Sequence, residues 1–166
     1  VNQAWIRGHH FYVDERVIVP RSYIGELLDG GLDSVLVDAG AITTALDLCT
    51  GSGCLAILMA HTFPDATVDA VELSKDAAAV AARNIDGHAL ADRVHLHTGD
   101  LFAPLAGRRY DLIISNPPYV TQSAVDAFPP EYKAEPVMAH LGGADGMDLV
   151  HRILAEAPNH LTPDGI

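Results

Sequence analysis

Strand-like and helix-like segments alternate from residue 44 onward, and this alternation constrains the fold more than any other feature. Apolar runs typical of buried strands occur at residues 46–49, 67–71, 94–97 and 110–115. Helical stretches lie between strands at residues 54–61 and from Ser74, a good helix cap, to about Gly87. Such alternation indicates a parallel sheet with helices on both faces and ligands beyond the carboxyl ends of its strands. We therefore predict a doubly wound, mostly parallel α/β sheet of the Rossmann-like type.

The two ends of the chain differ from this central pattern. Residues 11–13 and 17–19 flank Asp14, Glu15 and Arg16, which predicts an N-terminal β-hairpin. Pro20 ends the hairpin, and Ser22 can cap a short helix that stops at the Gly30 and Gly31 pair. We divide the chain into a hairpin with its connecting helix, residues 1–33, and a catalytic core, residues 34–166.

The last predicted elements are a helix at residues 146–159 and the start of a fifth strand at Ile166. A sheet of four strands would leave an apolar edge, so we expect the sheet to be truncated here and the natural chain to continue. No apolar run reaches the roughly 18 residues of a membrane span, and the N-terminus has no signal-peptide layout. Two cysteines form no disulfide framework, so we expect a cytoplasmic protein.

A glycine-rich turn separates the first strand of the sheet from the helix that follows it. Gly51, Ser52 and Gly53, with Ala56, fit the pattern Gly-x-Gly-x-x-Ala, in which backbone N–H groups approach an anion at a helix N-terminus. Glu72, at the end of the second strand, has the spacing of a residue that binds ribose hydroxyls. The pattern indicates an adenosine-type cofactor and leaves nicotinamide dinucleotide and S-adenosylmethionine both open.

A second motif follows the fourth strand and distinguishes these two cofactors. It consists of Asn116, Pro117, Pro118 and Tyr119. An amide nitrogen is a poor nucleophile because its lone pair is delocalised. The Asn116 side-chain oxygen and the Pro117 carbonyl can accept its two N–H groups and position it, while the proline rings hold the loop rigid. Tyr119 offers a flat surface for stacking a planar group. The motif indicates methylation of an amide or base nitrogen.

On these motifs the chain resembles the class I S-adenosylmethionine-dependent methyltransferases with an Asn-Pro-Pro-Tyr motif. It is most similar to the protein-(glutamine-N5) methyltransferases, in the branch acting on large-subunit ribosomal protein three. The stretches that carry the resemblance are residues 8–22, residues 46–54, Glu131 with Tyr132, and Glu135 with Pro136. The resemblance implies methyl transfer to the side-chain amide nitrogen of a glutamine in a ribosomal protein.

The resemblance also implies a role for each residue that matches a family motif. Asp47 would brace the cofactor loop, and Glu72 would bind both ribose hydroxyls. Asp100 would accept a hydrogen bond from the adenine amino group, with the Leu101 backbone at the ring edge. The methionine end of the cofactor would be wrapped by Cys49, Thr50, Gly51, Ser52 and Gly53. Asn116 would also contact the cofactor, and the glutamine would be bound by Asn116, Pro117, Pro118 and Tyr119.

Several other polar residues have ordinary structural explanations. His95 and His97 share one face of a strand but lack further ligands, so we predict no metal site. His9 and His10 are expected to be solvated at a strand entry, and the spacing of Cys49 and Cys54 is not that of a redox pair. Arg21, and a loop with Glu131, Tyr132 and Glu135, could either border the active site or be exposed.

The net charge of the chain helps to distinguish two classes of methyltransferase that share the Asn-Pro-Pro-Tyr motif. With 22 Asp and Glu against 10 Lys and Arg, the formal net charge is −12. This charge disfavours direct binding to nucleic acid and favours a basic ribosomal protein as the partner. An amino-methyltransferase acting on adenine is the alternative, and a non-catalytic fragment that binds a cofactor, or part of a nicotinamide oxidoreductase, is the third possibility.

Overall fold

The computed structural model describes residues 2–20, 23–32, 36, 39–128 and 135–166. The strands are β1 (Gln3–Ile6), β2 (His9–Tyr12), β3 (Thr44–Leu48), β4 (Thr67–Glu72), β5 (Val94–Thr98) and β6 (Leu112–Ser115). The helices are α1 (Ile24–Glu26), α2 (Cys54–Thr62), α3 (Lys75–Gly87), α4 (Gln122–Asp126) and α5 (Asp148–Glu156). A π-helical turn spans Leu27–Gly31, and 3-10 turns span Ala39–Ala41, Ala103–Leu105, Val137–Ala139 and Ala157–His160.

The central sheet contains four parallel strands in the order β5-β4-β3-β6. The first strand of the sheet along the chain, β3, therefore lies between β4 and β6. Its last residue, Leu48, is paired with Val71 on one side and Ser115 on the other. This arrangement confirms the predicted α/β fold class, and it brings the segments that follow these strands together at one edge.

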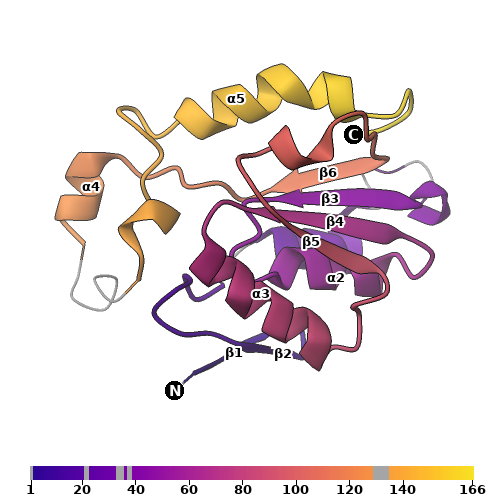
Figure 1. Cartoon of the computed structure of the whole chain (residues 1–166), viewed down its shortest axis with the longest axis horizontal. Helices are drawn as coiled ribbons and strands as arrows, with labels where there is room; N and C mark the ends of the chain where they lie inside the picture. Colours follow the sequence, from indigo (N-terminus) through magenta and orange to yellow (C-terminus); the bar gives the residue numbers. More distant parts are fainter. Residues whose placement is uncertain (1, 21–22, 33–35, 37–38, 129–134) are drawn as a thin grey trace.

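Helices cover both faces of the sheet, as the alternation of strands and helices predicted (Figure 1). Helices α2 and α3 pack below the sheet and α5 packs above it. On β3 the side chains alternate between two cores: Ala45 contacts the α2 side, whereas Leu46 and Leu48 belong to the cluster with Ile153 of α5. Because helices cover both faces, β3 is almost entirely buried, whereas the edge strand β5 also carries exposed residues.

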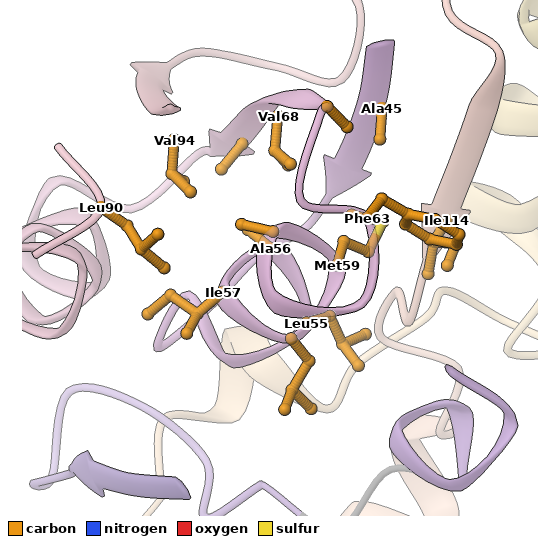
Figure 2. Close-up of a cluster of buried hydrophobic side chains, with 14 of the residues drawn as sticks. Ala45, Leu55, Ala56, Ile57, Met59, Phe63, Val68, Leu90, Val94 and Ile114 are labelled. Atoms are coloured by element: carbon orange, nitrogen blue, oxygen red, sulfur yellow. The ribbon is translucent and has the colours of Figure 1, made fainter. Parts of the chain in front are cut away.

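Helix α2 is the most deeply buried helix of the fold. Residues 54–60 are all buried, and Ala56 and Met59 lie on the side facing the strands that carry Ala45 and Val68 (Figure 2). Full burial of a side chain as large as Met59 contributes about 1.5 to 3 kcal/mol to stability. This packing fixes the N-terminus of α2, and hence the glycine-rich turn before it, relative to the sheet.

The N-terminal hairpin exists, but the predicted position of its strands was wrong. The strands are β1 and β2, with Ala4 paired with Phe11, and residues 13–20 contain no strand. Arg7 and Gly8 have positive φ angles of 52° and 79°, which is the geometry of a two-residue hairpin turn. The predicted turn is instead a local turn in which the Asp14 carboxylate accepts a hydrogen bond from the Arg16 backbone N–H.

Most other predicted elements lie close to their expected positions. Ser74 caps α3 by accepting a hydrogen bond from the Ala77 N–H, at 3.3 Å. The helix predicted at residues 146–159 is α5 followed by the 3-10 turn Ala157–His160. The Ile166 N–H donates to the Asp111 carbonyl and the Ile166 carbonyl accepts from the Ile113 N–H, so residue 166 lies beside β6, while the expected fifth strand stays a prediction. Ser22 and the proposed division at residue 33 lie outside the described residues, as does Arg21.

None of the helices in the described residues has the length and apolarity needed to span a membrane.

Candidate functional site

A cavity opens at the carboxyl ends of the four sheet strands. The space inside it, with the open mouth included, is about 810 Å³. The residues after all four strands contribute to its walls. The predicted site residues that line it are Cys49, Gly51, Glu72, Asp100, Leu101, Asn116 and Pro118. The structure thus brings the predicted segments after the four strands together at this cavity.

Other predicted site residues support the cavity without lining it. These described residues are Asp47, Thr50, Ser52, Gly53, Pro117 and Tyr119. Ser52 is buried, and its carbonyl accepts a hydrogen bond at 2.8 Å from the buried Asn84 side-chain amide. The same Asn84 amide exchanges hydrogen bonds with the Tyr12 backbone at the end of β2. Asn84 therefore joins the loop after β3 to the N-terminal hairpin.

The loop between β3 and α2 adopts an unusual backbone conformation. Cys49, Gly51 and Gly53 have positive φ angles of 60°, 56° and 80°. Gly51 borders the cavity, and a Cβ atom placed on it would meet no atom within 4 Å, so the missing side chain leaves room for a ligand. Gly53 packs against α3, where its Cβ atom would lie 3.2 Å from that of Ala81. The loop can therefore present backbone N–H groups at close range to a ligand.

Asp47 braces this loop from a fully buried position at the end of β3. Its Oδ2 atom accepts hydrogen bonds from the Thr50 hydroxyl at 2.5 Å and from the Ala56 N–H at 3.1 Å. Its Oδ1 atom has no partner among the described residues. Burial raises the pKa of Asp47 from 3.8 to about 7, and the hydrogen bonds from Thr50 and Ala56 oppose this rise. Asp47 is thus mainly protonated in the fold at mildly acidic pH.

This raised pKa predicts a change of stability with pH. Because the pKa of Asp47 is higher in the folded state, its contribution to stability is complete below pH 3.8 and is lost as the pH rises towards 7. Asp47→Asn cannot ionise, so its stability relative to the parent chain should increase by about 1 to 3 kcal/mol between pH 4 and 7.5. Urea unfolding at both pH values measures this difference. Exposed Asp65→Asn is the control, and an equal change in both variants would contradict the prediction.

Glu72 at the end of β4 is held in one orientation by two backbone groups. The Gly51 N–H donates to its Oε2 atom and the Ser74 N–H donates to its Oε1 atom, both at 2.8 Å. Each carboxylate oxygen can accept more than one hydrogen bond, so Glu72 retains the capacity to bind hydroxyl groups in the cavity. It therefore links the glycine-rich loop to a position suited to a ribose.

Asp100 and Leu101 lie on the cavity wall after β5. The Asp100 Oδ2 atom forms an ion pair at 2.7 Å with Arg152 of α5, a contact that the sequence analysis did not anticipate. Both side chains are about half exposed, so the pair is weak and leaves Oδ1 available. Leu101 has a positive φ angle of 47° and a buried side chain. Leu101 also lines the cavity.

The motif after β6 places a polar amide at the cavity. The Asn116 side chain is half-buried, lines the cavity and makes no hydrogen bond to the described residues. Pro118 also lines the cavity, whereas Tyr119 is 63% exposed. The cavity surface therefore offers a free amide beside the glycine-rich loop, and Tyr119 lies where a large substrate could cover it.

A glycine-rich segment, residues 142–146, packs against this motif and was not predicted as part of the site. A Cβ atom on Gly142 would lie 2.7 Å from the Pro118 carbonyl oxygen and 2.7 Å from the Tyr119 Cα atom. A Cβ atom on Gly146 would overlap the Tyr119 carbonyl oxygen. The Val120 N–H donates to the His140 carbonyl, and the Val120 carbonyl accepts from Gly142. The motif can lie this close because Gly142 and Gly146 have no side chains. The sequence Gly-Gly-Ala-Asp-Gly was the available signal.

The rim of the cavity includes residues far apart in the sequence. Glu135 accepts a hydrogen bond at 3.1 Å from the Val19 N–H and pairs with His140 at 3.1 Å. It therefore ties the segment after the hairpin to the loop behind the motif, which is a structural role. Glu131 and Tyr132 lie outside the described residues. Arg16 and Met138 also line the cavity, although no sequence pattern marked them.

The residues considered for redox or metal chemistry in the sequence have other surroundings. Burial is the main reason that the pKa of Cys49 and that of Cys54 rise to about 12, so neither thiol ionises readily. His97 contacts the Asp69 carboxylate at 2.7 Å, and Tyr110 donates to the same carboxylate. These contacts explain His97 as part of a polar network within the fold.

A family profile, two curated proteins and a solved structure that resemble this chain are all named as methyltransferases. The profile of the methyltransferase small domain matches residues 31–128. Proteins named ribosomal protein uL3 glutamine methyltransferase from Bradyrhizobium diazoefficiens and Bordetella pertussis are 61% and 57% identical to this chain over 99% of its length. The matches cover 54% and 55% of those proteins, so the chain spans about half of their length. A solved methyltransferase from Pyrococcus furiosus shares the fold, with a TM-score of 0.66 and 23% identity over 96% of this chain and 68% of that one.

Proposed function

The chain belongs to the methyltransferase small domain family, and from this premise we propose that it is the S-adenosylmethionine-binding part of a protein-glutamine methyltransferase. The proposed reaction transfers a methyl group to the N5 atom of a glutamine side chain in ribosomal protein uL3. The observation that carries this proposal is the Asn116 amide, which faces the same cavity as Glu72 and the glycine-rich loop.

The relatives and the charge of the chain support the proposed substrate. Both relatives described above carry uL3 glutamine methylation in their names and match nearly the whole chain. The formal charge of −12 favours a basic protein partner over a nucleic acid. A ribosomal protein would be met in the cytoplasm, which is where we propose that this protein acts.

The cavity fits the proposed cofactor. Gly51 leaves open space beside the backbone of the loop, Glu72 presents an oriented carboxylate, and Asp100 with Leu101 forms the next part of the wall. We propose that these residues contact the methionine end, the ribose and the adenine in that order. When bound, the sulfonium of S-adenosylmethionine supplies an activated methyl group with a good leaving group.

The residues of this chain then have mainly a positioning role. The Asn116 side-chain oxygen accepts one N–H of the glutamine amide, and the Pro117 carbonyl accepts the other. Pro118 has no N–H and cannot compete for these acceptors. Holding the nitrogen in line with the methyl group supplies most of the acceleration, since proximity and alignment of reactants lower the barrier by several kcal/mol. The methylated nitrogen loses its proton after transfer, so no general base is needed beforehand.

The direct test uses the full-length protein, purified uL3 and isotopically labelled S-adenosylmethionine. Peptide mass spectrometry should find one labelled methyl group on a glutamine side chain of uL3. A parallel reaction with adenine-containing DNA and RNA should give no labelled base. Labelled adenine with unlabelled uL3 would instead support the amino-methyltransferase alternative, and labelling of neither substrate would refute the proposed activity.

A variant at Glu72 tests the proposed cofactor site. The Glu72→Gln side chain has one oxygen that can accept from a backbone N–H group, and its NH₂ group faces the second N–H group. Affinity for S-adenosylhomocysteine should therefore fall about 10- to 100-fold. Calorimetry with S-adenosylhomocysteine and with methylthioadenosine, which shares the ribose but lacks the amino-acid end, measures the loss. Equal losses support contact with the ribose. A loss for S-adenosylhomocysteine alone would limit Glu72 to holding the loop, and exposed Glu26→Gln serves as the control.

A further inference from the structure

Three histidine side chains from separate elements meet on the side of the molecule where the hairpin packs against two helices. His9 lies on β2, His61 in the last turn of α2 and His88 directly after α3. These elements all lie on the α2 side of the sheet (Figure 1). One ring nitrogen from each histidine lies within 4.8 Å of the other two. The residues are far apart in the sequence, so no spacing motif predicted this cluster.

One pair of these nitrogen atoms has the separation expected of two ligands on one metal ion. The His61 Nε2 and His88 Nδ1 atoms are 3.4 Å apart, which is the long limit for a hydrogen bond. Two histidine ligands at about 2.0 to 2.1 Å from a tetrahedral zinc ion lie roughly 3.4 Å apart. The His9 and His61 rings stack with their centroids 4.4 Å apart, so the third ring lies beside this pair.

A second contact determines which nitrogen of His88 donates a hydrogen bond. Its Nε2 atom lies 2.9 Å from the His10 carbonyl oxygen, which can only accept a hydrogen bond. The proton of neutral His88 therefore sits on Nε2, and the lone pair of Nδ1 faces His61. Metal-binding histidines are commonly oriented in this way, with the second nitrogen donating to a carbonyl group.

The three histidines are partly accessible to solvent, so an ion could reach them. His61 is exposed, so an ion can enter from solvent, whereas His9 and His88 are half-buried. The adjoining pocket is lined by Leu28 and Leu58, and the charge of Arg7 is compensated by an ion pair with Asp29.

We propose that His9, His61 and His88 form a zinc site, with water as the fourth ligand. Neutral imidazole nitrogens suit zinc and neighbouring transition metals, and they do not suit Mg²⁺ or Ca²⁺. The ion would join the hairpin to the ends of α2 and α3. Helix α2 begins at the glycine-rich loop, and His61 lies about 10 Å farther along its axis, so the site is structural and separate from the cofactor cavity.

The test uses the 166-residue chain, purified without a histidine tag and stripped of metal with a chelator. Calorimetric titration with ZnCl₂ should show one saturable site, and saturating Zn²⁺ should raise the Tm by at least about 3 °C. MgCl₂ should do neither. Co²⁺ should give the visible absorption bands of a tetrahedral or five-coordinate ion.

The decisive variant is His61→Gln, which removes an exposed ligand with little risk to the fold. Zn²⁺ affinity should fall at least about tenfold and the Tm increase should disappear, while affinity for S-adenosylhomocysteine stays unchanged. The matched control is His151→Gln, an exposed histidine on α5, which should bind Zn²⁺ as the parent chain does. Absence of a saturable Zn²⁺ site in the parent chain, or unchanged affinity in His61→Gln, would overturn the proposal. Either result is independent of the proposed methyltransferase activity.

Discussion

Asn116→Ala is expected to reduce methyl transfer by about 100- to 1,000-fold while affinity for S-adenosylhomocysteine changes only a few fold. The substitution removes the side-chain oxygen that would accept one glutamine N–H, an interaction that matters most in the transition state. Affinity for the cofactor should persist because Gly51, Glu72 and Asp100 are untouched. Single-turnover transfer to uL3 by the full-length protein measures the rate, and calorimetry measures the affinity.

Two comparisons make this result specific. The control is Asn159→Ala, an exposed asparagine in the 3-10 turn after α5, which should retain the parental rate. A parental rate in Asn116→Ala would remove the central element of the proposed mechanism. A similar loss of rate and of cofactor affinity would instead mean that Asn116 acts chiefly on the cofactor.

Gly142→Ala is expected to lower the transfer rate by about 100-fold, although Gly142 does not line the cavity. The added methyl group would lie 2.7 Å from both the Pro118 carbonyl oxygen and the Tyr119 Cα atom, which is closer than real contacts allow. It would also lie 2.5 Å from the Gly146 carbonyl oxygen, so residues 142–146 and the motif must move apart. A displacement of about 1 Å in a positioning group can cost about 100-fold in rate. Single-turnover kinetics with saturating cofactor measures this loss.

The matched control for this variant is Gly87→Ala at the end of α3. A Cβ atom on Gly87 meets nothing within 4 Å, so this variant should keep the parental rate. The far-ultraviolet circular dichroism of Gly142→Ala should match that of the parent chain, because the sheet does not depend on this loop. An unchanged rate in Gly142→Ala would show that the glycine-rich segment does not position the motif.

Much of the cavity could be predicted from the sequence because its residues follow directly after strands. The carboxyl ends of parallel strands meet at one edge of the sheet, so the sequence positions of Gly51, Glu72, Asp100 and Asn116 were enough to place them together. The alternation of apolar segments did not predict the strand order, because periodicity identifies elements but not their neighbours. The resemblance to known methyltransferases supplied the roles of individual residues.

Contacts between distant segments could not be predicted in this way. The ion pair of Asp100 with Arg152 and the packing of Gly142 on Pro118 depend on how loops cross in space. The hairpin was misplaced for a local reason: the turn at Arg7 and Gly8 needs positive φ angles, and arginine does not signal such a turn. The apolar residues at 17–19 looked like a strand, yet Val17 is buried against Ala77 and Val80 without sheet pairing.

The buried amide of Asn84 has a consequence for how the protein opens. The Asn84 amide nitrogen donates hydrogen bonds to the Tyr12 carbonyl of the hairpin and to the Ser52 carbonyl of the cofactor loop. Detaching the hairpin would therefore remove one of the hydrogen bonds that orient the side chain holding this loop. Local unfolding of the hairpin and loosening of the loop should therefore occur as one cooperative event, with similar protection of their amides from hydrogen exchange. Asn84 and the hairpin, which bind no ligand, would in this way determine the fraction of molecules in which the cofactor loop is folded.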